Sequence, residues 1–246
     1  MKNEGFGKKG SARYGKQGEI MKKWVVANWK MNGSKELVGA YKNAFGNADN
    51  LIACPPFVYL NAIGTNAGAQ NVHHLPKGAY TGEVSAQILA EIGVKYCLVG
   101  HSERRQYFHE SDDLIKIKAN ACQESNITPI ICVGESLAEY LDGQTIKVLV
   151  RQLQNCLPDS PQFWVAYEPL WAIGTGQTPT VEEISNVHYM LRESLPGVVL
   201  LYGGSVSALN ASEIFAINNV DGVLVGGASL DISAIKNIYN LANKAR

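Results

Sequence analysis

The sequence lacks three features: a net charge, a long apolar run and a pair of closely spaced cysteines. Its 22 Lys and Arg residues balance 22 Asp and Glu residues. No overall electric field therefore draws the chain to nucleic acid or to a membrane surface, and any bound anion must be captured locally. No run approaches the roughly 18 apolar residues of a membrane-spanning helix. These absences argue against nucleic-acid and membrane partners.

The cysteines are five in number and include no Cys-x-x-Cys pair. Three of them, Cys54, Cys97 and Cys132, lie inside apolar runs. An odd number of cysteines in such surroundings is typical of reduced, buried thiols in the cytoplasm rather than of disulfides or a metal cluster. The sequence also shows no nucleotide-binding fingerprint. We therefore expect a cytoplasmic protein that needs neither a metal ion nor a cofactor.

Residues 1–20 differ in composition from the rest of the chain. They contain five glycines and five basic residues, with only two acidic residues and no apolar stretch that could act as a secretory signal. We interpret this segment as a disordered extension and expect the folded domain to span residues 21–246. A basic targeting arm is the alternative interpretation of residues 1–20.

From residue 21 onward, short apolar runs alternate with longer segments of helical periodicity. The runs are nearly continuous and rich in β-branched residues, which is typical of strands covered on both faces. The expected strands are Trp24–Trp29, Leu51–Cys54, Ala67–Asn71, Tyr96–Gly100, Thr128–Val133, Phe163–Tyr167, Val198–Tyr202 and Val220–Val225. The clearest helical segments are Ser111–Ser125, Ser136–Cys156, Val181–Leu195, Ala208–Asn218 and Ile232–Ala245, with Ser111 and Ser207 as N-cap candidates.

Eight strand-helix units in about 225 residues predict an α/β fold, a single-domain (β/α)₈ barrel. A doubly wound open sheet is the alternative. Such a sheet usually has a glycine-rich dinucleotide loop after its first strand, whereas here residues 28–33 follow that strand.

Polar residues follow several of the expected strands. In a barrel, these C-terminal strand ends meet at one mouth, which is where barrel enzymes hold their active sites. The candidates are Asn28 and Lys30, Gln70 and Asn71, His101 with Ser102 and Glu103, Glu168, Ser205 with Gly203 and Gly204, and Gly226 with Gly227.

Some of these residues have a purely structural alternative. Taken alone, His101 is more simply a half-buried histidine with satisfied hydrogen bonds. Glu103 has Arg104 and Arg105 beside it as ready ion-pair partners, and Cys132 is simply part of the core near the mouth.

The glycine pairs 203–204 and 226–227 follow the last two strands. In barrels of this kind, these loops often bind phosphate through backbone amides and a short helix N-terminus. Glycine lets the backbone approach an anion closely, so the two pairs predict a phosphorylated ligand. Tight turns at both places are the alternative.

Six sequence blocks resemble the triosephosphate isomerase family, in order and from residue 21 to the C-terminus. The blocks are Asn28–Asn32 (NWKMN), Val99–Arg105 (VGHSERR), Cys132–Glu135 (CVGE), Ala166–Gly176 (AYEPLWAIGTG), Tyr202–Val206 (YGGSV) and Leu224–Leu230 (LVGGASL). The resemblance implies interconversion of dihydroxyacetone phosphate and D-glyceraldehyde 3-phosphate by proton transfer through an enediolate, without a cofactor.

The resemblance also implies a role for each site residue. Glu168 matches the base and His101 the neutral electrophile and proton shuttle, at a helix N-terminus. Lys30 matches the cation that stabilises phosphate and oxyanion, with Asn28 beside it. Glu103 matches a further acid near Lys30, which overrules its purely structural interpretation. The phosphate-binding positions are Gly174, Ser205, Gly226 and Gly227, and residues 169–179 match a mobile lid.

The resemblance further implies a homodimer. Loop 70–84 matches a finger that inserts beside the partner's active site, with Thr81 near the partner's Asn28 and Lys30. The chain departs from the family pattern in two places. It is about a dozen residues shorter between residues 21 and 70, so we expect trimmed first helices. Pro179 occupies the second hinge of the lid, where we expect it to stiffen the hinge and to start the next helix.

Two other functions are weaker. Another phosphosugar isomerase on the same barrel explains the glycine pairs but not the combination of Glu168, His101 and the lid. A degenerate barrel kept as a binding module is expected to have lost a catalytic group, and all of them are present.

Overall fold

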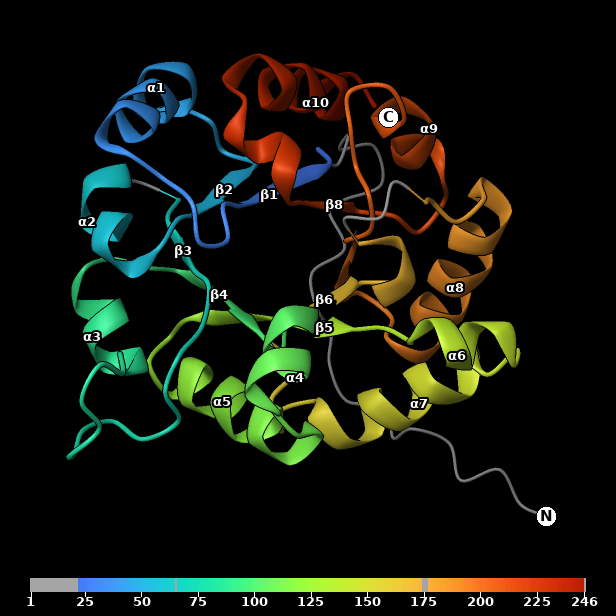
Figure 1. The fold of residues 1–246 in the computed structure, drawn as a ribbon, viewed down its shortest axis with the longest axis horizontal. Coiled ribbons are helices and arrows are strands. Elements are labelled where there is room, and N and C mark those ends of the chain that lie inside the picture. The colour runs from blue at the N-terminus through green and yellow to red at the C-terminus, as the bar shows by residue number, and fades with distance from the viewer. Residues whose placement is uncertain (1–21, 65, 174–176, 246) are drawn as a thin grey trace.

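The computed structural model describes residues 22–64, 66–173 and 177–245. The expected extension 1–20 and the candidate phosphate-binding Gly174 lie outside the described residues. Eight parallel strands form a curved sheet surrounded by a ring of helices (Figure 1). The strands are β1 (Trp24–Asn28), β2 (Leu51–Cys54), β3 (Gly68–Ala69), β4 (Tyr96–Val99), β5 (Thr128–Val133), β6 (Trp164–Tyr167), β7 (Val199–Tyr202) and β8 (Gly222–Val225).

The strand order is β2-β1-β8-β7-β6-β5-β4-β3, which follows the chain once around the barrel. The seam between β2 and β3 is joined by a single parallel bridge, Ala53 to Ala67, and by the hydrogen bond from the Ala53 N–H to the Asn66 carbonyl (3.2 Å). The predicted (β/α)₈ barrel is confirmed, and the doubly wound alternative is wrong because the two end strands meet.

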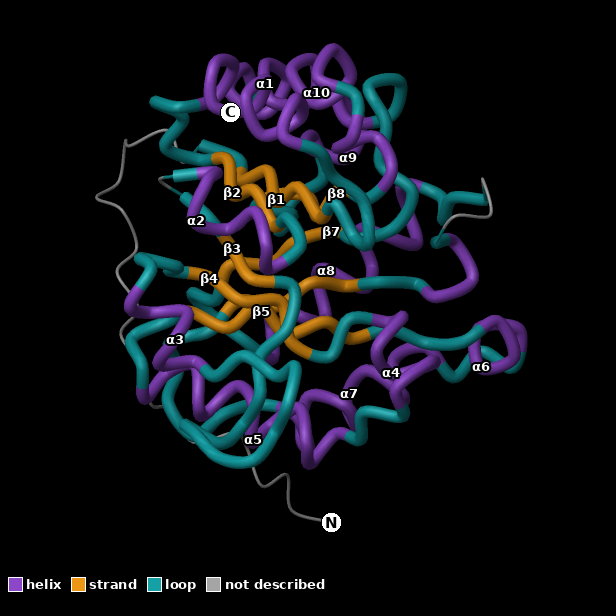
Figure 2. The backbone as a smooth tube through the Cα atoms, turned by 60° about the vertical axis from the view of Figure 1, so that its left-hand side comes forward, coloured by secondary structure: helices purple, strands orange, loops and turns teal. Residues whose placement is uncertain are grey.

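Helices cover the outside of the barrel, as the side view shows (Figure 2). Most of the longer ones begin at a Ser, Thr or Asp whose side chain accepts a backbone N–H of the first turn. They are α1 (Lys35–Phe45), α2 (Leu60–Ile63), α3 (Ala86–Glu91), α4 (Ser102–Phe108), α5 (Asp112–Glu124), α6 (Leu137–Leu141), α7 (Thr145–Cys156), α8 (Val181–Ser194), α9 (Ala211–Ala216) and α10 (Ile232–Lys244). Three short 3₁₀ turns are η1 (Phe57–Tyr59), η2 (Leu170–Ala172) and η3 (Gly227–Leu230).

Three local expectations were wrong. The segment Ser136–Cys156 is two helices, α6 and α7, because Gly143 adopts a left-handed conformation (φ 66°) between them. Ser207 is not an N-cap: α9 begins three residues later than such a cap would require, after Asn210. Pro179 does not occupy the first helical position of α8, because Thr180 is its N-cap and Val181 its first residue.

Alternate residues of each strand face opposite sides of the barrel wall. The residues that face outward pack with the helices in the larger core. The residues that face inward fill the barrel and include Val26, Ile130, Ala166 and Leu224. Because side chains alternate along a strand, the residue two positions after an inward-facing one also faces inward, at the mouth. Asn28 and Glu168 stand in that position after Val26 and Ala166.

The opposite end of the barrel is closed by an aromatic floor. Trp24, Tyr96 and Trp164 precede the inward-facing residues of their strands by two positions and pack against them. Their ring centroids lie 4.8 Å (Trp24–Trp164), 5.0 Å (Tyr96–Trp164) and 6.2 Å (Trp24–Tyr96) apart. The barrel is therefore open at the mouth formed by the C-terminal strand ends.

The five cysteines are all free and buried, as expected from their apolar surroundings. Burial raises the pKa of the Cys54 and Cys132 thiols well above its usual range, so both remain neutral. None of the helices in the described part of the chain has the length and hydrophobicity needed to cross a bilayer.

Unfolding should become easier below pH 6.5 because of His188. This side chain on α8 has no exposed surface, and burial lowers its pKa to about 4 from the usual 6.5. Between pH 6.5 and pH 4, His188 is protonated in the unfolded chain but not in the folded chain, so a fall in pH favours unfolding. The free energy of unfolding should fall by about 3 kcal/mol from pH 6.5 to pH 4 through this residue.

Urea unfolding of the wild type and of His188→Gln at a series of pH values tests this prediction. The variant should lose that part of the pH dependence. Equal slopes in the two proteins would show that His188 does not cause it.

Candidate active site

A cavity of ≈ 180 Å³ opens at the mouth of the barrel. It brings together residues that are nearly 200 positions apart in sequence and that follow five different strands. Its lining consists of Asn28, Lys30, His101, Glu168, Ile173, Gly203, Gly204, Ser205, Val206, Leu224, Gly226 and Gly227. Every residue predicted to be catalytic or phosphate-binding in the described part of the chain lines this cavity except Glu103, which contacts Lys30 beside it. The other candidates at the strand ends, Gln70, Asn71 and Ser102, do not line it.

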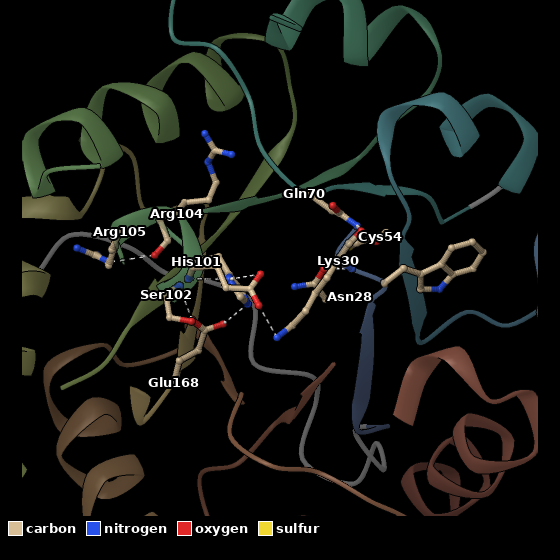
Figure 3. A network of polar contacts seen from close by, with 12 residues as sticks. Asn28, Lys30, Cys54, Gln70, His101, Ser102, Arg104, Arg105 and Glu168 are labelled. Carbon is tan, nitrogen blue, oxygen red and sulfur yellow. Dashed lines mark hydrogen bonds and ion pairs between the residues drawn. The ribbon is translucent and has the colours of Figure 1, made fainter. Parts of the chain in front are cut away.

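Glu168 lies at the tip of β6, with only 1 % of its surface exposed. The Ser102 N–H, in the first turn of α4, donates to its Oε2 at 2.9 Å, and its Oε1 lies 3.3 Å from His101 Nε2 (Figure 3). A Cβ on Gly203 would come within 2.9 Å of the Glu168 Cγ, so only glycine leaves room for this carboxylate. A buried carboxylate needs such donors, since removing a charge from water is costly.

His101 is the N-cap residue of α4 and is 6 % exposed. Its Nδ1 accepts the Glu103 N–H at 3.2 Å. An Nδ1 that accepts a hydrogen bond carries no proton, so the ring is the neutral tautomer with its proton on Nε2. Nε2 is therefore the donor atom of the ring, and it lies 3.3 Å from Glu168 Oε1 without forming a hydrogen bond.

Lys30 follows β1 in the left-handed backbone conformation, with φ of 53°. This conformation costs a non-glycine residue of order 1–3 kcal/mol and is enriched at functional sites. Its N–H donates to Asn28 Oδ1 at 3.0 Å, and its Nζ forms an ion pair with Glu103 Oε1 at 2.7 Å. The ammonium therefore lies near the cavity with a carboxylate on its outer side.

The suggested pairing of Glu103 with its neighbouring arginines was wrong. Arg104 pairs instead with the buried Glu110 at 2.5 Å, and Arg105 pairs with Asp112 at 2.7 Å. Neither arginine contacts Glu103, whose carboxylate pairs with Lys30 instead.

The opposite wall of the cavity consists of the loops after β7 and β8. A Cβ on Gly226 would lie 3.4 Å from the Lys30 Cε, so this loop runs directly beside the ammonium side chain. Gly227 begins the 3₁₀ turn η3, and the Ser205 hydroxyl donates to the Ala172 carbonyl at 2.5 Å. Backbone N–H groups that lie this close to an ammonium group can bind an anion together with it.

The segment that follows Glu168 is anchored on the side away from the cavity. Trp171 donates from Nε1 to Glu135 Oε1 at 2.8 Å, and Tyr167 donates its hydroxyl to the same oxygen at 3.2 Å. Glu135 has no exposed surface, and burial raises the pKa of its carboxyl group above the usual range. The Trp171 ring also stacks on Tyr140, with centroids 4.2 Å apart.

Three apolar residues of the lining were not predicted as site residues: Ile173, Val206 and Leu224. Leu224 belongs to the inward-facing set of β8, so its position was available from strand alternation. Ile173 lies in the segment 169–179 that the family resemblance identifies as a lid, but no strand period there indicates which way its side chain faces. Together with Val206, these two residues give the cavity an apolar part of its wall.

The described residues include no cluster of three or more His, Cys, Asp and Glu side chains that could hold a metal ion. The cavity instead offers a buried carboxylate, a neutral imidazole and an ammonium group, which can accept a proton, donate a hydrogen bond and bind an anion respectively. This combination suits proton transfer on a small anionic carbonyl compound.

Comparisons with known proteins agree with this chemistry. The sequence model described as triosephosphate isomerase matches residues 23–242. A triosephosphate isomerase from Delftia acidovorans is 46 % identical over 238 residues, covering 86 % of this chain and 95 % of the relative. One from Idiomarina loihiensis is 43 % identical over 235 residues, covering 84 % and 92 %.

A solved structure gives the same result. The crystal structure of triosephosphate isomerase from Bartonella henselae superposes with a TM-score of 0.81 at 33 % sequence identity, and covers 90 % of this chain and 99 % of that one. The chain belongs to the triosephosphate isomerase family.

Proposed function

We propose that this protein interconverts dihydroxyacetone phosphate and D-glyceraldehyde 3-phosphate. The observation that carries the proposal is the convergence of Glu168, His101 and Lys30 on one cavity beside two glycine loops. The reaction moves one proton between two adjacent carbons and another between two oxygens. It therefore needs a base near the carbons, a donor near the oxygens and a grip on the phosphate.

Glu168 is the base in this proposal. It takes a proton from the carbon next to the carbonyl and returns it to the neighbouring carbon. In the resting arrangement its Oε2 accepts the Ser102 N–H, so the side chain leaves that donor when it reaches a substrate carbon. The apolar side chains of Ile173 and Leu224 beside it keep water from solvating the carboxylate, which strengthens it as a base.

His101 is the electrophile. Its Nε2–H donates to the carbonyl oxygen, and the enediolate that forms carries its negative charge on that oxygen. A neutral imidazole can pass its proton to one oxygen and recover one from the other. Lys30 stabilises the same developing charge through its ammonium group, while Glu103 holds that group in place at 2.7 Å.

The phosphate binds at the loops after β7 and β8. Ser205, Gly226 and Gly227 offer backbone amides on one side, and Lys30 offers its charge on the other. Gly174, which belongs to the proposed lid, adds an amide when the lid closes. Binding energy from the phosphate, remote from the reacting carbons, then positions those carbons against Glu168.

Turnover of D-glyceraldehyde 3-phosphate, with dihydroxyacetone phosphate as product measured through a coupled dehydrogenase, tests the proposal. A five-carbon ketose phosphate serves as the control substrate. Turnover of the triose phosphate no faster than the uncatalysed background would contradict the function. Preference for the larger sugar would point to a different phosphosugar isomerase.

We also propose that the chain acts as a homodimer through loop 70–84. This loop extends beyond the ring of helices between β3 and α3 (Figure 1). Exposed apolar side chains on this loop and at the start of α3 line one hollow, with Leu75 at 36 %, Tyr80 at 46 % and Ile88 at 50 % of their surface. Clusters of this kind mark protein interfaces. In the proposed dimer, Thr81 of one subunit lies near Asn28 and Lys30 of the other.

Substitution of Thr81 by Arg should separate the dimer, since it introduces an unpaired charge beside the partner's ammonium group. The expected result is a monomer in sedimentation experiments, with reduced kcat because the finger no longer supports the partner's Lys30 segment. Lys77→Arg, which keeps the charge of the same loop, serves as control. A wild-type protein that is fully active as a monomer would refute the dimer.

The barrel of residues 21–246 is the catalytic domain in this proposal, and residues 1–20 are an extension outside it. The family match over residues 23–242 supports that boundary. A cytoplasmic location is also proposed, and the five free, buried cysteines are consistent with it.

A further inference from the structure

Gln70 contacts two segments of the mouth without lining the cavity itself. It directly follows β3, and its Nε2 donates to the Lys30 carbonyl at 2.9 Å and to the Cys54 carbonyl at 2.8 Å (Figure 3). A primary amide group has two N–H donors, and here both are used. Because both neighbours are carbonyl oxygens, the NH₂ end of the side chain must face them.

The two hydrogen bonds lie at the weakest seam of the barrel. Strand β3 has only two residues, and a single bridge joins β2 to Ala67, the residue before β3. The Cys54 carbonyl also accepts the Trp29 N–H at 3.1 Å. The Gln70 side chain thus connects the end of β3, the end of β2 and the turn after β1.

The same contact completes the support of the Lys30 backbone. On one side the Lys30 N–H is held by Asn28 Oδ1 at 3.0 Å, and on the other its carbonyl is held by Gln70. A left-handed residue persists only where its surroundings fix it. Because both the N–H and the carbonyl of Lys30 are hydrogen-bonded, its backbone is fixed, and its side chain extends toward Glu103 and Gly226.

We propose that Gln70 is a positioning residue for Lys30. Its amide fixes the carbonyl of Lys30, and so keeps the residue in the left-handed conformation that directs the ammonium group into the cavity. Gln70 itself does not touch the substrate. The inference rests on the proposed role of Lys30 as the cation of the site.

A double-mutant cycle between Gln70 and Lys30 separates positioning from mere support of the seam. Leucine at position 70 has a similar size and no donor, so Gln70→Leu should lower kcat/KM by about 10- to 100-fold, as expected for a misplaced charge. In a Lys30→Ala background the same change should cost almost nothing more. Equal losses in both backgrounds would overturn the proposal, and so would wild-type kcat/KM in a folded Gln70→Leu protein.

Asn66 offers a matched control at the same seam. Its side chain donates to the Ala48 carbonyl, its φ of 63° suits glycine, and it makes no contact with Lys30. Asn66→Gly should lower the thermal midpoint and leave kcat/KM unchanged. If Asn66→Gly and Gln70→Leu lower kcat/KM equally, a weakened seam explains both losses and the proposal fails.

If Gln70→Leu does not fold, Gln70→Glu can be used instead to test whether residue 70 positions Lys30. A protonated Glu can donate to one carbonyl, whereas an ionised Glu repels both. The ratio of its kcat/KM to that of the wild type should therefore rise as the pH falls, and a flat ratio would overturn the proposal. Lys30→Ala tests the premise separately. If Lys30 is not the cation of the site, this variant retains wild-type kcat/KM.

Discussion

Glu168→Gln is expected to lower kcat by roughly 10²–10⁴-fold, the usual contribution of a general base. Glutamine has nearly the same shape, and its amide oxygen can still accept the Ser102 N–H that holds Glu168 at 2.9 Å. The fold and the affinity for the phosphate should therefore be preserved, while proton abstraction is lost. Steady-state kinetics with both triose phosphates, together with the thermal midpoint, gives the answer.

Glu110 provides a matched control for this substitution, since it is another buried carboxylate with 6 % exposure. It pairs with Arg104 and with Lys118 on the outside of the barrel, away from the cavity. Glu110→Gln leaves the buried Lys118 and the partly buried Arg104 without their counter-ion, so stability should fall while kcat stays unchanged. If Glu168→Gln retained wild-type kcat, the proposed base would be another group.

His101→Gln should also reduce kcat by roughly 10²–10⁴-fold with the fold intact. A glutamine oxygen can replace Nδ1 as acceptor of the Glu103 N–H, now at 3.2 Å, so the start of α4 should survive. The amide cannot exchange protons between two substrate oxygens as an imidazole does. Exchange of solvent hydrogen into substrate and product, followed by NMR, would report this loss directly.

The control for His101 lies at the other end of the same helix. His109 is the C-cap of α4, with a left-handed φ of 52° that asparagine tolerates well. His109→Asn should leave kcat unchanged. A His101→Gln protein with wild-type kcat would remove the role assigned to this imidazole.

The location of the site could be predicted because strand alternation and barrel topology are simple rules. Asn28 and Glu168 come two positions after inward-facing residues at the ends of their strands, so strand alternation alone predicts that they face the mouth. Their grouping with His101, Lys30 and the glycine loops then follows from the closure of the sheet. Their chemical roles came from the resemblance to a family, not from these rules.

Side-chain partners could not be predicted in the same way. Arg104 and Arg105 follow Glu103 directly, yet the direction of each on α4 sends them to Glu110 and Asp112. Sequence proximity does not fix such directions, because helix neighbours at adjacent positions do not face one another. The break between α6 and α7 was missed for a related reason, since helical periodicity continues across the left-handed Gly143.

The aromatic floor of Trp24, Tyr96 and Trp164 determines by which route substrate enters and product leaves. A barrel sealed at one end offers no second route, so a triose phosphate leaves by the opening through which the previous one arrived. The product must therefore leave through this opening before the next substrate molecule can bind. The two triose phosphates should accordingly compete with each other for free enzyme, whichever direction the reaction runs.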